Sequence, residues 1–318
     1  MCRVHSLSWL SALLLAASAF CQQSAPQPAA APALDAGRDL AQIIASGKLY
    51  HLGVPYANFV TGSGDGLDVD LVKEFCDWIG RTNDTQVQYV PIETDWPRLI
   101  PDLVGKDLKV AGNGVTFTGD CPVRGDLIAS GLTMLPWRQQ ALDFSPPSFP
   151  TQIWLLARAD SALAPITPSG EIGLDIQTVR GLLKPYAIMS KPSTCLDPNL
   201  YKLDEVAGEV KRFDGSLNHL APAIINGEAE ATLLDVPDAL VALRKWPGKV
   251  KIIGPLSERQ TMALGFRRTS PALRAAFTTF FTEFKRSGKY VALVRKYYPT
   301  VFEHYADFFV EQGCSEPK

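Results

Sequence analysis

The sequence predicts an α/β fold built as two domains. Helical and strand patterns alternate from Asp35 onward, which is typical of a sheet covered by helices on both faces. With 318 residues, 46% of them hydrophobic, the chain can bury a large core, and its length corresponds to about two domains. A turn-rich passage at residues 164–173 predicts the junction between them.

Hydrophobic periodicity predicts the first elements. A short helix carries apolar residues around Ile43, and a strand is expected directly after it at residues 48–54. A glycine-rich turn then leads to an amphipathic helix, and an aspartate ahead of Leu71 is expected to cap that helix. A strand at residues 87–91 and a helix at residues 96–104 complete this part.

The middle of the chain contains an interruption and a second set of elements. Residues 106–125 are irregular and rich in glycine, and we interpret them as an inserted loop or hairpin. A strongly apolar strand is predicted at residues 152–158. The segment 173–251 has its own pattern, including a helix at residues 217–226 and a strand at 231–234, and is long enough for a domain.

The clearest helix lies in the last third of the chain. Ser270 is expected to cap it, Pro271 occupies its first turn, and Gly288 ends it. We interpret its aromatic face as core, formed by Leu273, Phe277, Phe280, Phe281 and Phe284. A second short helix follows and is stopped by Pro299.

The N-terminal residues predict export. Arg3 precedes an apolar run too short to span a bilayer, and an Ala-Ser-Ala site follows. This pattern predicts a cleaved signal peptide at residues 1–19, a Pro/Ala-rich linker at residues 20–35, and a mature protein free in the periplasm. The alternative is a lipoprotein anchored at Cys21, although the residue before this cysteine is bulkier than a lipobox carries.

Composition argues against several functional classes. A net charge of -2 and a pI near 6.1 give no electrostatic reason to expect nucleic acid or an anionic membrane as partner. Histidines are scattered, the aspartates at residues 65–70 do not complete a calcium loop, and no phosphate, dinucleotide or nucleophile motif is complete. We therefore expect no metal, no cofactor and no catalytic residue. Outside the signal, the cysteines whose pairing stays open are Cys21, Cys76, Cys121, Cys195 and Cys314.

Several short motifs occur in a fixed order along the chain. They are GKL (47–49), YANF (56–59), GLDVDL (66–71), DWPRLI (95–100), GLTMLPWR (131–138), LDFS (142–145), NGEAEA (226–231), LD (234–235) and SGKY (287–290). This set resembles the family 3 solute-binding proteins of ABC transporters, the polar amino acid-binding type. The most diagnostic stretch of that family reads GMTITPERxxxVDFSxPY. The resemblance covers nearly all of the mature chain.

The resemblance implies a type II periplasmic-binding-protein fold, in which two α/β lobes are joined by two hinge strands. Lobe 1 is expected to comprise residues 36–155 and 256–318, and lobe 2 residues 156–255. The implied function is to capture a small polar solute, an amino acid, by hinge closure and to deliver it to an ABC permease in the inner membrane. The protein is expected to be a monomer and not an enzyme.

The resemblance also implies a ligand site that draws on both lobes. Arg138 is expected to clamp the α-carboxylate of the ligand, with hydrogen bonds from Thr133 and the Gly131 backbone. Asp235 is expected to accept the α-ammonium from the second lobe, and Tyr56 to cover the ligand side chain. The chemistry agrees, because a guanidinium meets a carboxylate in a two-point fork and a charge-assisted hydrogen bond contributes about 1.5–3 kcal/mol.

The rest of the site differs from the family pattern. Ser193 or Thr194 is expected to complete the carboxylate pocket, but Pro192 stands where that loop usually has glycine. Trp137 replaces the usual glutamate before the arginine, and the insertion at residues 106–125 lies just ahead of the carboxylate-binding strand. These departures leave the identity of the ligand open.

Two other functions remain as alternatives. The first is a dehydratase that resembles the cyclohexadienyl and arogenate dehydratases built on the same scaffold. Such an enzyme needs a proton donor, and the position of the family's glutamate aligns with Leu196, next to Asp197. The second alternative is a ligand-free periplasmic accessory protein, which would be favoured if the insertion blocked the cleft.

Overall fold

The computed structural model describes residues 33–317 together with Met1. The predicted signal peptide, Cys21 and most of the predicted linker lie outside these residues. The helices are α1 (Leu40–Ser46), α2 (Leu67–Thr82), α3 (Trp96–Val104), α4 (Pro136–Ala141), α5 (Ile172–Leu182), α6 (Leu220–Ile225), α7 (Val236–Lys245), α8 (Pro271–Arg286), α9 (Lys289–Tyr297) and α10 (Phe302–Glu311).

The strands and the short 3-10 turns complete the secondary structure. The strands are β1 (Lys48–Gly53), β2 (Gln88–Glu93), β3 (Lys106–Ala111), β4 (Gly114–Asp120), β5 (Leu127–Ile128), β6 (Asp143–Phe144), β7 (Phe149–Thr151), β8 (Ile153–Arg158), β9 (Ala187–Ser190), β10 (Glu209–Arg212), β11 (Ala231–Asp235), β12 (Val250–Pro255), β13 (Gln260–Met262) and β14 (Gly265–Phe266). The 3-10 turns are η1 (Pro198–Tyr201), η2 (Leu203–Glu205), η3 (Leu217–His219) and η4 (Pro299–Val301).

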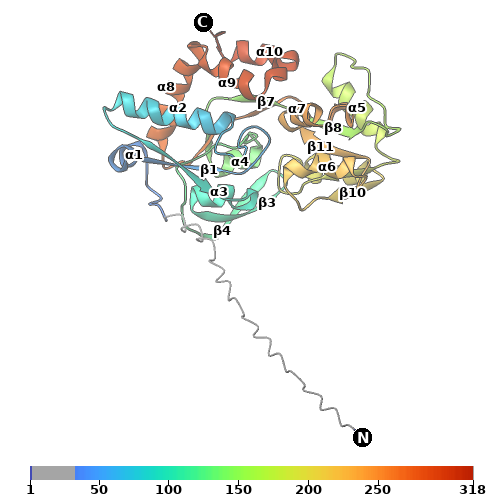
Figure 1. Cartoon of the computed structure of the whole chain (residues 1–318), viewed down its shortest axis with the longest axis horizontal. Coiled ribbons are helices and arrows are strands. Elements are labelled where there is room, and N and C mark those ends of the chain that lie inside the picture. Colours follow the sequence, from blue (N-terminus) through green and yellow to red (C-terminus); the bar gives the residue numbers. More distant parts are fainter. Residues whose placement is uncertain (2–32, 318) are drawn as a thin grey trace. The chain divides into compact units, whose positions relative to one another are not determined.

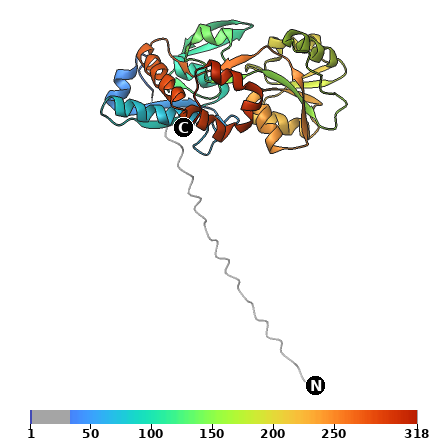
Figure 2. The ribbon, with the colours of Figure 1, turned by 90° about the horizontal axis from the view of Figure 1, so that it is seen from above.

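The first five-stranded sheet has the order β2-β1-β5-β14-β6. Strands β2, β1 and β5 run parallel, and β14 pairs antiparallel with both β5 and β6. Helices α1 and α2 contact α8 beside this sheet, so the two ends of the described chain pack together. Figure 1 and Figure 2 show this as red C-terminal helices beside blue N-terminal ones.

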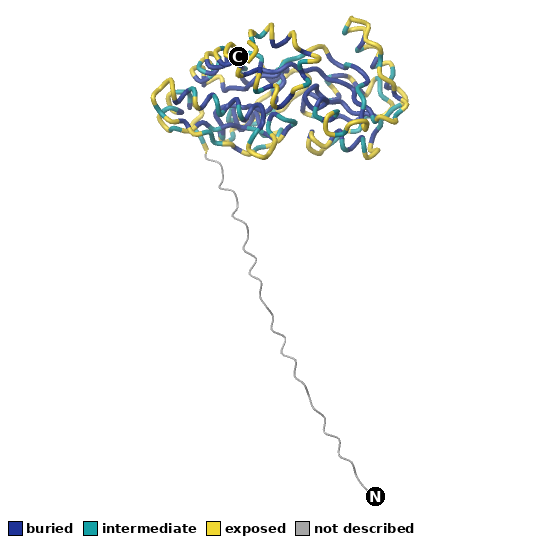
Figure 3. The backbone as a smooth tube through the Cα atoms, turned by 45° about the horizontal axis from the view of Figure 1, so that its top comes forward, coloured by how far each residue is buried: buried dark blue, intermediate teal, exposed yellow. Residues whose placement is uncertain are grey.

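The second five-stranded sheet has the order β10-β9-β11-β8-β12. Strands β10, β9 and β11 are parallel, whereas β8 runs antiparallel to β11 and β12. Helix α6 contacts β8, and α5 and α7 contact β12. Buried residues concentrate along the strands of both sheets, as the dark blue segments of Figure 3 show. Each sheet therefore has its own core, as expected for a two-lobe α/β protein.

A two-stranded antiparallel sheet, β7 with β13, lies in the chain between the two large sheets. The chain leaves the first sheet through β7 and enters the second at β8, with only Gln152 between them. It returns from β12 to β13. The boundary predicted between residues 155 and 156 falls inside β8, which belongs to the second sheet, and the turn-rich passage at residues 164–173 lies after that strand.

The segment predicted as an insertion forms a hairpin. Strand β3 pairs antiparallel with β4 from Lys106 opposite Asp120 to Ala111 opposite Gly114. Most of its side chains are exposed, including Phe117. The hairpin pairs with neither large sheet.

Two helix caps predicted from the sequence are wrong. The hydroxyl of Ser270 does not cap α8 but donates to the carbonyl of Arg38 at 2.9 Å. The carboxylate of Asp39 instead accepts the backbone N–H groups of Ala272 (3.0 Å) and Leu273 (2.7 Å). Helix α2 begins at Leu67, ahead of the aspartates expected to cap it.

The aromatic stripe of α8 is confirmed as core. Four of its five members are no more than 2% exposed, and Phe284 is 6% exposed. The rings of Phe277 and Phe280 pack against Phe75 of α2 with centroids 5.1 and 5.3 Å apart. Each such pair adds to the stabilisation from area burial, so this contact ties the C-terminal helices to the N-terminal part of the fold.

Candidate functional site

The aromatic wall of the candidate site comes from the loop after β1. The Tyr56 backbone forms a bridge with Val60, and the ring lies nearly perpendicular to Trp96, with centroids 5.4 Å apart. The side chain is 1% exposed. Its hydroxyl lies near the carboxylates of Asp235 and Asp238, but it makes no hydrogen bond of good geometry to a described residue. Burial and the charges of Asp235 and Asp238 raise the pKa of Tyr56 well above its usual value.

Gly131 supports this wall from behind. Its φ of +59° lies in the left-handed region, and a Cβ there would stand 2.6 Å from Phe59 Cδ2 and 2.9 Å from Tyr56 Cε1. Only glycine suits such a position. Its N–H donates to Asp68 Oδ2 at 2.7 Å, and burial raises the pKa of the Asp68 carboxyl to about 7.

Arg138 supplies the buried positive charge of the site. It lies in α4, whose first residue is a proline, and is 3% exposed. Its Nη1 donates to the Thr133 carbonyl at 2.9 Å. Neither Arg138 Nε nor Thr133 Oγ1 has a hydrogen-bond partner among the described residues. Burial lowers the pKa of Arg138, while the charge of Asp235 acts in the opposite direction.

Asp235 supplies a negative charge from the second sheet. It ends β11 and occupies the N-cap position of α7, so its side chain lies at the carboxyl edge of a largely parallel sheet, where α/β proteins bind ligands. The thiol of Cys195 donates to its Oδ2 at 3.5 Å, and Oδ1 has no partner among the described residues. Burial raises the pKa of the Asp235 carboxyl to about 6.

These groups form one cluster drawn from both sheets, which we call the Arg138–Asp235 cluster. Its members act on one another electrostatically or by hydrogen bonding: Tyr56, Thr133, Arg138, Cys195, Asp235 and Asp238. Five of the six carry a buried polar atom without a partner among the described residues. Because buried polar atoms are normally hydrogen-bonded, such a concentration is typical of a ligand site and makes this cluster the candidate functional site.

The two predicted residues of the second-lobe loop, Ser193 and Thr194, make their hydrogen bonds within that loop. The Ser193 side chain is exposed, and its N–H donates to Asp197 Oδ2 at 2.7 Å. The Thr194 hydroxyl donates to the Lys191 carbonyl (2.8 Å) and accepts from the Leu196 N–H (3.0 Å). The described contacts therefore link neither hydroxyl to the Arg138–Asp235 cluster.

Trp137 and the hairpin lie next to the loop at residues 193–200. The Trp137 ring, together with Val110 and Gly112 of the hairpin, lines a small cavity of about 80 Å³ whose opposite wall is that loop. The same ring lies against the Arg138 guanidinium, 5.2 Å from its centroid. The two departures from the family pattern, Trp137 and the hairpin, thus meet beside Arg138.

Two members of the cluster were absent from the predicted site. Cys195 directly follows the predicted Thr194 in the same loop, and its thiol donates to Asp235. Asp238 lies three residues after Asp235 in the first turn of α7. The i to i+3 spacing, which puts two side chains on one helix face, was the available signal.

The described residues contain neither a candidate metal site nor a helix suited to span a membrane. Within residues 33–317 no group of three or more His, Cys, Asp or Glu side chains could hold a metal ion. In the same part of the chain, no helix has the length and apolarity needed to cross a membrane. The four cysteines described there are all unpaired: Cys76, Cys121, Cys195 and Cys314.

Two α/β lobes, each with its own five-stranded sheet, define a type II periplasmic-binding-protein fold. Solved structures of this fold class are similar to this chain. A variant of the arginine-binding protein ArgBP from T. maritima superposes with a TM-score of 0.63 at 23% identity, covering 82% of this chain and 99% of that one. An ancestral amino acid-binding protein described as a precursor of cyclohexadienyl dehydratase has a TM-score of 0.60 at 20% identity, covering 81% and 98%. These likenesses show the fold.

The family follows from the sequence match. Residues 123–300, more than half of the chain, match the model of the bacterial extracellular solute-binding proteins, family 3. The chain belongs to this family, and both the predicted family and the predicted fold class are therefore confirmed.

Two characterised relatives share part of the sequence. The octopine-binding periplasmic protein of Rhizobium meliloti is 23% identical over 230 residues, covering 68% of this chain and 70% of that protein. A membrane-bound lytic murein transglycosylase F of Desulfosudis oleivorans is 24% identical over 212 residues, covering 66% of this chain. The match spans only 44% of the transglycosylase's length.

Proposed function

We propose that this protein binds an amino acid between its two lobes and delivers it to an ABC importer. The observation that carries the proposal is the set of buried, unpartnered polar atoms that converge from both sheets in the Arg138–Asp235 cluster. A guanidinium on one side and a carboxylate on the other match the two charges of a zwitterion. The arginine-binding and octopine-binding proteins that resemble this chain support the same class of ligand.

Each charge has a defined role in the proposal. Arg138 pairs with the α-carboxylate through Nε, which has no other partner among the described residues, and Thr133 adds its hydroxyl. Asp235 accepts the α-ammonium, and Tyr56 covers the remainder of the ligand. The N–H of Gly131 is engaged by Asp68, so in this proposal it positions Tyr56 and makes no direct contact with the ligand.

Closure of two rigid lobes would bring these groups together. We assign the hinge to the β7–β13 pair and the lobe boundary to Gln152. The Asn218 side chain, from η3, accepts the Ala57 N–H at 2.8 Å and donates to the Pro55 carbonyl at 3.4 Å. Such a contact between the lobes is expected only in the closed form. We further propose a periplasmic monomer that serves a permease in the inner membrane.

The dehydratase alternative has less support. Leu196 is buried and apolar where that branch carries its acid. Its neighbour Asp197 accepts hydrogen bonds from Ser193 and Asn199 within its own loop. The ligand-free accessory role also has less support, because it requires the hairpin to block the ligand site. The hairpin lies beside Trp137, and the polar atoms of the Arg138–Asp235 cluster remain without partners among the described residues.

A calorimetric screen of the mature protein against amino acids tests the proposal, with Arg138→Ala as the decisive variant. This change leaves a desolvated ligand carboxylate unpaired and should cost about 2–5 kcal/mol, roughly thirtyfold to several thousandfold in affinity. Arg138→Lys should rescue only part of the loss, since lysine cannot form the fork. Arg212→Ala is the matched control, because that arginine is exposed and pairs with Asp204. Unchanged affinity in Arg138→Ala would refute the site.

A further inference from the structure

Asp238 is a second buried carboxylate that the zwitterion leaves without a partner. It is 6% exposed, and its Oδ2 has no hydrogen-bond partner among the described residues. Burial and the repulsion of Asp235 raise the pKa of the Asp238 carboxyl well above its usual value, and the nearby Tyr56 hydroxyl acts in the opposite direction. None of the ion pairs between described residues includes Asp238.

The charges of the Arg138–Asp235 cluster do not balance around a simple zwitterion. The cluster holds one guanidinium and two carboxylates, and a bound α-carboxylate and α-ammonium add no net charge. Arg138 and Asp235 are then both paired, and one negative charge remains at Asp238. An isolated buried carboxylate is costly. The imbalance disappears only if Asp238 takes up a proton or the ligand brings a second cation.

Asp238 also faces open space. It lines a cavity of about 390 Å³ between the loop at residues 57–61 and helices α6 and α7. Asn58, Thr61 and Asn218 give this cavity polar walls, and Asp238 is the only carboxylate in its lining. Lys245, also in the lining, is exposed at the far end of α7. Asp238 is therefore the one member of the Arg138–Asp235 cluster that also lines this cavity.

We propose that Asp238 and this cavity form a subsite for a second positive charge, so that the ligand is an amino acid with a guanidinium or ammonium at the end of its side chain. The inference rests on the proposed function, because it needs Arg138 and Asp235 to hold the α-groups. With those groups held, the ligand side chain extends past Tyr56 and places its cation against Asp238. A planar guanidinium suits a carboxylate next to an aromatic hydroxyl, since it donates along several directions.

Pairs of ligands equal in length but different in charge test the subsite. Calorimetry on the mature protein compares L-arginine with L-citrulline, and L-lysine with L-2-aminoheptanoic acid, in which a methyl group replaces the side-chain ammonium. The cationic member of each pair should bind about 10- to 150-fold more tightly, because the neutral member leaves Asp238 buried and unpaired. In Asp238→Asn, arginine affinity should fall by a similar factor while citrulline affinity stays within about threefold.

Asp175→Asn is the matched control. Asp175 is likewise a buried aspartate in the first turn of a helix, α5, but its Oδ1 accepts the Ser169 N–H at 2.8 Å. This control should keep the preference for arginine over citrulline. Thermal unfolding without ligand checks that both variants are folded.

The outcomes separate this inference from the proposed function. If the parent protein binds citrulline as tightly as arginine, or a neutral amino acid more tightly than either cation, the second-charge subsite is wrong while the zwitterion site stands. Equal loss for arginine and citrulline in Asp238→Asn also overturns it, since Asp238 would then act on the fold alone. If no amino acid binds, or if Arg138→Ala binds arginine as the parent does, the proposed function fails, and this inference fails with it.

Discussion

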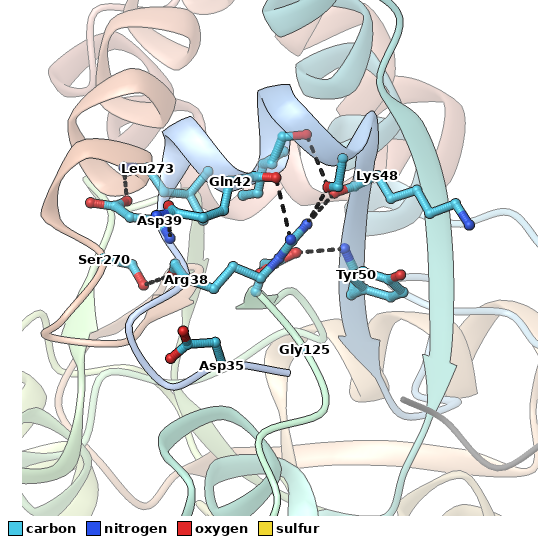
Figure 4. Close-up of polar contacts among 12 residues, drawn as sticks. Asp35, Arg38, Asp39, Gln42, Lys48, Tyr50, Gly125, Ser270 and Leu273 are labelled. Carbon is cyan, nitrogen blue, oxygen red and sulfur yellow. Dashed lines mark hydrogen bonds and ion pairs between the residues drawn. The ribbon is translucent and has the colours of Figure 1, made fainter. Parts of the chain in front are cut away.

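The part of the chain that the structure describes contains two clusters of buried arginine and aspartate, which differ in how fully they are hydrogen-bonded. The first, which we call the Asp126 cluster, comprises Arg38, Asp126 and Arg267. Figure 4 shows Arg38 and its surroundings beside α1. The second is the Arg138–Asp235 cluster between the sheets. Both bury charge that would be costly alone, but only the first supplies its own partners.

In the Asp126 cluster almost every polar atom is paired. Arg38 donates to Asp126 Oδ1 at 2.9 Å, to Ser46 Oγ at 2.9 Å and to the Lys48 carbonyl at 2.6 Å. The other Asp126 oxygen accepts the Tyr50 N–H at 2.9 Å. Among the described atoms of this cluster only Arg267 Nε lacks a partner. A network completed in this way positions the first helix and strand, and its purpose is structural.

In the Arg138–Asp235 cluster the pairing is incomplete in five of six residues. Buried polar groups without partners lower the stability of the folded protein. A ligand that supplies the missing hydrogen bonds is bound more tightly for the same reason. Burial and charge therefore do not distinguish a candidate binding site from a structural network. The two clusters differ in how many of their buried polar atoms lack a hydrogen bond.

The largest expected effect is the loss of stability when the Asp126 cluster loses its carboxylate. Asp126→Asn leaves two buried guanidinium groups without a carboxylate and should lower the free energy of unfolding by about 3–5 kcal/mol. Urea unfolding at neutral pH measures it. Affinity for the ligand should stay within about threefold, because Asp126 lies outside the Arg138–Asp235 cluster. Asp204→Asn, at an exposed ion pair, should leave stability unchanged; if Asp126→Asn behaved like it, the structural assignment would be wrong.

The next largest expected effect is the pH dependence of ligand affinity at the Arg138–Asp235 cluster. Burial in the closed form raises the pKa of the Asp235 carboxyl to about 6. A neutral carboxyl cannot form an ion pair with an ammonium, so below pH 6 binding requires Asp235 to lose its proton. Kd should therefore rise about tenfold for each unit by which the pH falls below 6. Calorimetry between pH 7 and pH 5 measures the slope. An affinity that is flat over this range, or equally steep in Asp235→Asn, would exclude Asp235 as the ammonium acceptor.

The sequence predicted the fold well because its local signals agreed with one another. The helix expected at residues 96–104 is α3, the strand expected at 231–234 is β11, and the inserted segment is a hairpin. The cap of α8 could not be predicted, because Asp39 reaches it from more than two hundred residues away and no local pattern reports such a contact.

The candidate site was predicted less completely. Arg138, Thr133, Tyr56 and Asp235 meet in one cluster, as their motif positions implied. The assignment of these residues to a ligand stays a prediction. Asp238 has no counterpart in the motif, and its importance depends on burial and on missing partners, which only coordinates reveal.

The most direct test of the account is the stability of ligand-free Asp235→Asn. A carboxyl whose pKa is raised in the folded state binds a proton more tightly folded than unfolded, so its contribution to stability is lost as pH rises through about 6. Removing this charge should therefore raise the free energy of unfolding at pH 7 by on the order of 1–3 kcal/mol. The gain should shrink toward pH 4, while affinity for the amino acid falls.

Chemical unfolding of parent and variant at pH 7 without ligand gives the answer in one measurement. A variant that is at least as stable as the parent shows that the protein leaves Asp235 for a ligand to pair. A variant less stable by more than about 1 kcal/mol would show that Asp235, like Asp126, already has its partners within the fold, and would contradict the central claim.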